Sequence, residues 1–123
     1  MNDPRALVVD DDEPIRTLLA RIVEYEGFAV ETAKDGREAI ARIDSDGYKV
    51  ILLDLMMPRI DGWAVIDFIR SHAEHRGTKT YIVAAGEQRL STADQDVVSG
   101  VVSKPFDPAK LDLLLRNFVK SAS

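Results

Sequence analysis

The sequence contains no cysteine, which excludes disulfide bonds, thiolate metal sites and thiol nucleophiles. It also lacks an apolar stretch long enough for a signal peptide or a membrane span, so we expect a cytoplasmic protein without membrane contact. Basic residues are in deficit, because 16 Lys and Arg against 21 Asp and Glu leave a formal net charge of −5. This balance argues against a broad surface for direct nucleic-acid binding.

Repeats, low-complexity tracts and long linkers are absent as well, and 123 residues fit one domain over residues 1–123, with a core at about 4–120. Hydrophobic residues make up 46% of the chain and charged residues 30%, a composition typical of a globular protein. The sequence therefore predicts one folded unit with a single hydrophobic core.

Short apolar runs alternate with stretches of helical periodicity. Residues 6–9 and 50–53 are continuous apolar runs, which are typical of strands buried on both faces. Residues 15–23 carry apolar side chains at helical spacing, and residues 28–32 alternate as in a more exposed strand. The same signals predict helices that begin near Gly36, Gly62 and Pro108, and strands at residues 81–84 and 101–102.

Five strands that alternate with helices predict an α/β fold: a parallel sheet with right-handed crossovers and helices on both faces. One segment is weak. Residues 87–100 are mostly polar and leave few apolar positions for a helix between the last two strands. We expect that helix to be short or mobile.

Charged side chains follow three of the predicted strands. Asp10 and Asp11 follow the first strand, Asp54 follows the third and Lys104 follows the fifth. The carboxyl ends of parallel strands form the ligand-binding edge of such a sheet, so we expect these residues to converge. Two carboxylates about 5 Å apart repel by roughly 3 kcal/mol at an effective dielectric constant near 20. The acidic cluster therefore needs a cation or a proton.

A hard divalent ion, Mg²⁺ or Mn²⁺, meets this need, and Lys104 would neutralise the oxygens of an incoming anion. Carboxylates around such an ion suit phosphoryl transfer, with one carboxylate as the nucleophile. Asp54 is favoured because it stands alone, whereas Asp10 and Asp11 form a group suited to holding metal. Taken singly, an acidic residue after a strand is most often a helix cap, but the joint pattern favours a site.

Three groups of segments carry a resemblance to a known family: residues 7–11 with 14–16, residues 54–58 with 61–62, and residues 104–106. Together they make the chain closely similar, over residues 4–120, to the bacterial response-regulator receiver family. The resemblance implies a flavodoxin-like, doubly wound sheet in the order 2-1-3-4-5. It also implies that Asp54 is the phospho-acceptor.

Further roles follow from the resemblance. Asp11 and Asp54 would bind Mg²⁺ together with the main-chain carbonyl of Met56, and Asp10 would act mostly through a bound water. Asp12 adds a third acid to the same run and makes its register ambiguous, but the position at the strand end favours the first two.

Lys104 would contact the phosphoryl oxygens, and its peptide bond to Pro105 is commonly cis in the family. The phosphoryl donor would be a sensor histidine kinase or a histidine phosphotransfer protein, and the signal would pass to a downstream protein or a fused output domain. The resemblance thus implies a signalling domain that catalyses only its own phosphorylation and dephosphorylation, and not an enzyme.

Two switch positions depart from the family pattern. The family usually has Thr or Ser at the end of the fourth strand, where the candidates here are Ala84 and Ala85, and the following residues favour Ala85. The family's aromatic switch residue corresponds to Val101. We therefore expect an atypical output relay, and residues 87–100 are a candidate for the part that moves.

Other interpretations stay open at this point. A phosphate-independent, receiver-like interaction module would explain Ala85 and Val101, and a haloacid-dehalogenase-like phosphatase would use Asp10 as its nucleophile. The exposed side of the last helix is a candidate surface for a homodimer, although a core-packing stripe explains its leucines equally well.

Overall fold

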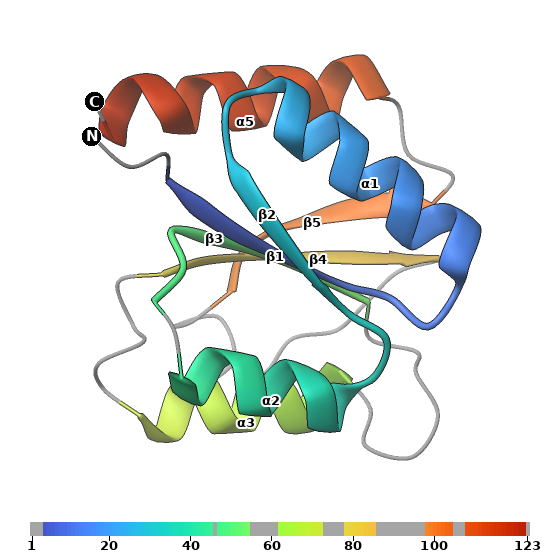
Figure 1. Ribbon diagram of the computed structural model, residues 1–123, viewed down its shortest axis with the longest axis vertical. Helices are drawn as coiled ribbons and strands as arrows, with labels where there is room; N and C mark the ends of the chain where they lie inside the picture. The colour runs from blue at the N-terminus through green and yellow to red at the C-terminus, as the bar shows by residue number, and fades with distance from the viewer. Residues whose placement is uncertain are drawn as a thin grey trace.

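The computed structural model describes residues 4–45, 47–54, 62–72, 78–85, 98–104 and 108–122. Five parallel strands form one sheet in the order β2-β1-β3-β4-β5, with helices on both faces (Figure 1). The predicted α/β fold and strand order are confirmed. The elements are β1 (Arg5–Val9), α1 (Glu13–Tyr25), β2 (Ala29–Ala33), α2 (Gly36–Ser45), β3 (Val50–Asp54), α3 (Gly62–Ser71), β4 (Lys79–Ala85), β5 (Val98–Lys104) and α5 (Pro108–Ala122).

The side chains of the central strands alternate between two helical layers. In β1, Ala6 and Val8 pack on the side of α1 and α5, and Leu7 and Val9 pack on the side of α2 and α3 (Figure 1). Because helices cover both faces, these strands are continuous apolar runs in the sequence. The helices contribute Leu19 and Val23 of α1, Ile43 of α2, Ile66 and Ile69 of α3, and Leu111 and Leu115 of α5.

The two ends of α1 follow from local chemistry. Asp12 precedes the helix, and its carboxylate accepts a hydrogen bond of 3.2 Å from the main-chain N–H of Ile15. Pro14 occupies the first turn, where no intrahelical partner for its nitrogen is needed. Gly27 follows the helix with φ 99°, a conformation that glycine adopts without steric cost. The helix predicted from the apolar spacing of residues 15–23 is confirmed.

The edge strand β5 begins three residues before the predicted start of the strand at 101–102. The ladder between β4 and β5 shifts register, so that Tyr81 pairs with Gly100 and Ser99 is the extra residue of a bulge. This part of the strand was not predicted, because it includes small and polar residues. Main-chain pairing at a sheet edge does not need an apolar side-chain run. The rest of the segment expected to hold a short helix, residues 87–97, lies outside the described residues.

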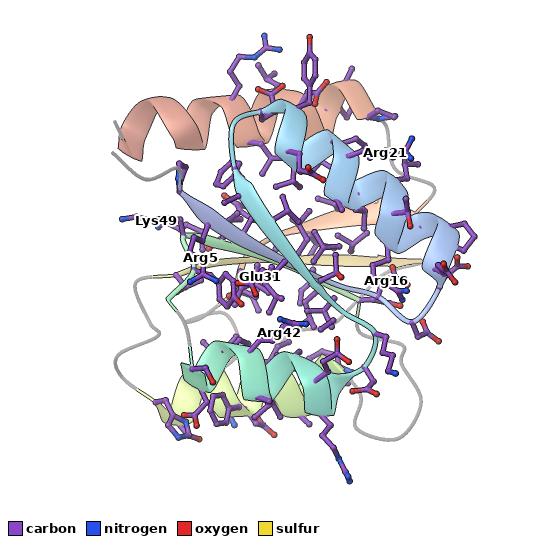
Figure 2. The ribbon with its side chains drawn as sticks, in the orientation of Figure 1. Arg5, Arg16, Arg21, Glu31, Arg42 and Lys49 are labelled. Carbon is purple, nitrogen blue, oxygen red and sulfur yellow. The ribbon has the colours of Figure 1, made fainter. Side chains whose placement is uncertain are left out.

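A network of charged side chains joins β1, β2 and α2. The carboxylate of Glu31 accepts hydrogen bonds from the guanidinium groups of Arg5 and Arg42, the second at 3.0 Å (Figure 2). Its Oε1 also accepts a hydrogen bond of 3.1 Å from the hydroxyl of Tyr48, just before β3. The network therefore connects the outer strand β2 to its neighbour β1 and to helix α2.

Candidate functional site

The sheet register brings the predicted acidic residues to one edge. Val9 of β1 pairs with Leu53 of β3, so the residues that follow them, Asp10 and Asp54, lie side by side at the carboxyl ends of the two strands. Asp10 is held against the neighbouring strand on its other side, because its main-chain N–H donates a hydrogen bond of 3.1 Å to the carbonyl of Ala33. The convergence expected from parallel strand ends is therefore observed for the first and third strands.

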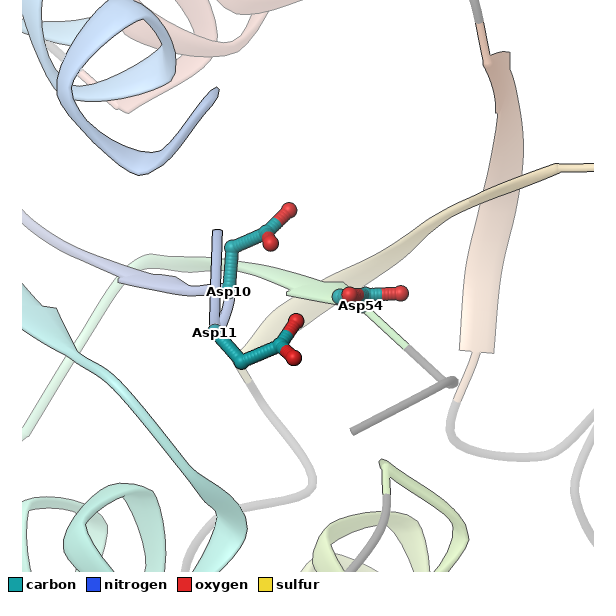
Figure 3. A group of neighbouring side chains, drawn as sticks. All are labelled: Asp10, Asp11 and Asp54. Carbon is teal, nitrogen blue, oxygen red and sulfur yellow. The ribbon is translucent and has the colours of Figure 1, made fainter. Parts of the chain in front are cut away.

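Asp10, Asp11 and Asp54 form a carboxylate cluster (Figure 3). Each of the three supplies one carboxylate oxygen, and these oxygens all lie within 4.8 Å of one another. Asp10 and Asp54 are 0% and 4% exposed, whereas Asp11 is exposed. Two of the negative charges therefore lie in a region that water solvates poorly, and the third lies at the surface where an ion can enter.

This geometry suits a small divalent cation. Ligand oxygens at about 2.1 Å from Mg²⁺ in octahedral coordination lie roughly 3 to 4.2 Å apart. The spacing in the cluster, within 4.8 Å, needs only small side-chain rotations to reach that range. Without a counter-ion, each pair of carboxylates at such distances repels by about 3 kcal/mol. The donor set, three carboxylate oxygens, is also the set that hard cations such as Mg²⁺ and Mn²⁺ prefer.

The run of three acids after β1 divides between two tasks. The carboxylate of Asp12 caps α1, as described above, and its main-chain N–H donates a hydrogen bond of 2.9 Å to Oδ1 of Asp10. That bond fixes the side chain of Asp10 in the cluster. Asp10 and Asp11 thus lie in the cluster with Asp54, while Asp12 caps the helix.

The predicted residues of β4 and β5 lie at the same edge of the sheet. Lys104 is the last residue of β5, and its Cα partner on β4 is Ala85. The side chains of these two residues lie outside the described part of the structure, as do Met56 and Pro105 in full. Val101 lies earlier in β5 and is 44% exposed.

Arg16 is a residue to which the sequence assigned no role. From the first turns of α1 its guanidinium donates a hydrogen bond of 2.9 Å from Nη1 to the main-chain carbonyl of Asp10. A signal for this contact is present in the sequence, since an arginine six residues after Asp10 is long enough to reach back over the connection. Spacing alone does not separate such an arginine from one that is exposed to solvent, as Arg21 on the same helix is.

Comparisons with known proteins agree on one family. The sequence model of the family described as the response regulator receiver domain matches residues 6–116. The chain is 35% identical over 125 residues to the transcriptional regulatory protein ResD of Bacillus subtilis, with 99% of this chain and 50% of ResD covered. It is 33% identical over 126 residues to the transcriptional regulatory protein TrcR of Mycobacterium tuberculosis, with 97% and 46% covered. The chain therefore spans about half the length of these relatives.

A solved structure gives the same result. The response regulator protein TrrA of Thermotoga maritima, in complex with Mg²⁺–BeF, superposes with a TM-score of 0.81 at 30% identity. The superposition covers 94% of this chain and 98% of TrrA. In the described parts of the chain, no helix combines the length and apolar character that crossing a bilayer requires.

Proposed function

The chain belongs to the response-regulator receiver domain family of two-component signalling, and we propose that it accepts a phosphoryl group on Asp54 in a Mg²⁺-dependent reaction. The observation that carries this proposal is the cluster of Asp10, Asp11 and Asp54 at the carboxyl edge of the sheet. Three carboxylates held this close in a folded chain are best explained by a bound cation and an anionic group that it attracts.

Asp54 is the nucleophile in this proposal. One of its carboxylate oxygens forms a bond to phosphorus while the bond between phosphorus and the donor's imidazole nitrogen breaks, and the electron pair stays with that nitrogen. Asp10 is less suited to this role, because it forms a group with Asp11 after β1 that suits metal binding. Hydrolysis would return the carboxylate by attack of water on the same phosphorus.

The remaining residues would hold the reacting groups. Asp11 and Asp54 would ligate the ion with the main-chain carbonyl of Met56, and Asp10 would contribute through a bound water. When bound, Mg²⁺ supplies the positive charge that the transferring oxygens need. Lys104, which ends β5 at the same edge, would contact the phosphoryl oxygens. The complex of the related TrrA with Mg²⁺–BeF supports a magnesium site here.

The donor would be a sensor histidine kinase or a histidine phosphotransfer protein in the cytoplasm. Both named relatives are transcriptional regulatory proteins about twice as long as the matched region. This supports the proposal that the signal passes to a downstream protein or a fused output domain. On this proposal the chain is one receiver domain that acts as a switch, catalyses only its own modification and does not itself bind nucleic acid or a membrane.

The output relay would be atypical. Ala85 has no hydroxyl to follow a phosphoryl group, and Val101 has no aromatic ring to rotate in response. These two substitutions favour a second candidate function, a receiver-like interaction module that works without phosphate. The complete acidic cluster favours the first candidate over the second.

Intact-mass measurement tests the proposal directly. The chain is incubated with acetyl phosphate and Mg²⁺, and parallel samples contain EDTA in place of Mg²⁺ or carry Asp54→Ala or Asp10→Ala. We expect one phosphoryl group on the unaltered chain, none in EDTA and none on Asp54→Ala. A phosphoryl group that persists on Asp54→Ala and disappears from Asp10→Ala would overturn the assignment in favour of the phosphatase-like chemistry. No modification, repeated with phosphohistidine donors, would replace the proposal with the phosphate-independent module.

A further inference from the structure

Arg16 holds both main-chain carbonyls that flank Asp11. Its guanidinium Nη1 donates to the carbonyl of Asp10 at 2.9 Å, and its main-chain N–H donates to the carbonyl of Asp12 at 2.8 Å. The second bond is the ordinary first bond of a helix. The first bond is different, since it needs a side chain that reaches back to the end of β1. It joins α1 to the residue before Asp11 and so limits the movement of the backbone between β1 and α1.

The position of Asp11 depends on this hydrogen bond from Arg16 more than the positions of Asp10 and Asp12 do. Asp10 is oriented by the N–H of Asp12, and Asp12 is oriented by the N–H of Ile15. The carboxylate of Asp11 is exposed, and within the described residues no group donates a hydrogen bond to it. The place of this carboxylate in the cluster is therefore set by the backbone on either side of it.

We propose that Arg16 is a positioning residue for the divalent cation: by fixing the carbonyl of Asp10, its side chain keeps Asp11 within ligand distance and sets the affinity of the cluster for the ion. The inference rests on the metal site of the proposed function. Hydrogen bonds that hold a metal ligand from outside the coordination sphere limit how far the ligand can move before the ion arrives, so less ordering free energy is lost on binding.

A simple electrostatic role for Arg16 gives the opposite sign. If Arg16 acted only through its positive charge, it would repel the cation, and its neutralisation would tighten binding. If Arg16 acts through its hydrogen bond to the carbonyl of Asp10, a replacement that loses this bond weakens binding of the cation. Arg21 provides the matched control, because it is an exposed arginine on the same helix and projects away from the sheet, whereas Arg16 lies on the side that faces it (Figure 2).

The experiment measures Mn²⁺ binding by the electron paramagnetic resonance signal of the free ion, with Mg²⁺ as a competitor. We expect Arg16→Gln to weaken binding roughly tenfold, Arg16→Lys to recover part of the loss through its own donor, and Arg21→Gln to bind as the unaltered chain does. With acetyl phosphate, Arg16→Gln should need more Mg²⁺ for half-maximal phosphorylation, and the rate at saturating Mg²⁺ should stay close to that of the unaltered chain.

Thermal unfolding in EDTA shows whether each variant is folded; if Arg16→Gln is not, Arg16→Lys and Arg16→Met carry the comparison. Unchanged or tighter Mn²⁺ binding by the folded variants, while the unaltered chain binds the ion, would overturn the role of Arg16 and leave the proposed function intact. No Mn²⁺ binding by the unaltered chain would overturn the metal site itself, and this inference with it.

Discussion

The ring of Tyr81 occupies the side of Gly100 where a side chain would stand, and the two residues are partners across the ladder between β4 and β5. A β-carbon built on Gly100 would lie 3.2 Å from Cδ1 and 3.3 Å from Cε1 of this ring, closer than ordinary van der Waals contact. The tyrosine thus covers a glycine that has no side chain of its own to pack. The contact directly follows the bulge at Ser99, where the register of the edge strand changes.

Gly100→Ala should therefore destabilise the protein. The new methyl group displaces the ring of Tyr81 by a few tenths of an ångström, and overpacking of this kind costs about 1 kcal/mol or more. Chemical denaturation gives the difference in the free energy of unfolding. Gly47→Ala is the control, because its β-carbon meets nothing within 4 Å and the change should be neutral or slightly stabilising. A loss of stability that persists unchanged in a Tyr81→Ala background would show that the ring is not its cause.

Burial of Tyr81 also predicts a dependence of stability on alkaline pH. Loss of water around its hydroxyl raises the pKa of Tyr81 above the ordinary value of 10.0. Since the folded state then holds this proton more tightly than the unfolded state, the contribution to stability is complete below pH 10 and is lost as pH rises through the folded pKa. Tyr81→Phe should flatten this alkaline decline in denaturation curves. Tyr25→Phe, at a ring that is 82% exposed, should leave the decline as it is.

Glu31→Gln should destabilise the protein by about 1 kcal/mol, because both Arg5 and Arg42 lose their shared carboxylate. The effect should shrink in about 1 M NaCl, where the Debye length falls to roughly 3 Å and the lost ion pairs matter less. Denaturation in low and high salt measures both quantities.

Glu38→Gln is the matched control for the same helix, since its carboxylate contacts one guanidinium alone, at 3.7 Å from Nε of Arg42 in an i,i+4 pair. Such a pair contributes only about 0.3–0.5 kcal/mol. Equal losses for Glu31→Gln and Glu38→Gln would contradict a special role for the network that joins β1, β2 and α2.

The fold was predictable where side-chain patterns carry it. The continuous apolar runs of β1 and β3 and the helical spacing in α1 follow from burial between two layers, so these elements were anticipated correctly. The strand order was anticipated from the family resemblance, because side-chain patterns do not specify it. The start of β5 was not, because Ser99 and Gly100 take part in the sheet through their main chains. Main-chain pairing at a bulged edge leaves no side-chain pattern in the sequence.

The candidate site was predictable for a similar reason. Asp10, Asp11 and Asp54 were named from their positions at strand ends, and parallel register alone brings such positions together. Arg16 was missed because its contact is made with a carbonyl group, which every residue has. Only the path of the chain around Asp11 shows why an arginine at this place differs from Arg21.

Asp54→Asn should have opposite effects on stability without and with metal. In EDTA the change removes one of three clustered negative charges at nearly constant shape, so the free energy of unfolding should rise by about 1–3 kcal/mol. Added Mg²⁺ should stabilise the unaltered chain by about 2.7 kcal/mol at a concentration of 100 times Kd, and the variant much less, because it has lost a ligand. Thermal unfolding in both conditions measures the two effects, and the order of stability should reverse.

Asp44→Asn serves as the control for this reversal, since it makes the same chemical change at an exposed position of α2 away from the cluster. It should leave both the stability in EDTA and the response to Mg²⁺ unchanged. If Asp54→Asn were less stable than the unaltered chain in EDTA, hydrogen bonds to the carboxylate of Asp54 would outweigh the repulsion from Asp10 and Asp11. If it also kept the full response to Mg²⁺, the ion would bind without Asp54, and the assignment of this cluster as the metal site would be wrong.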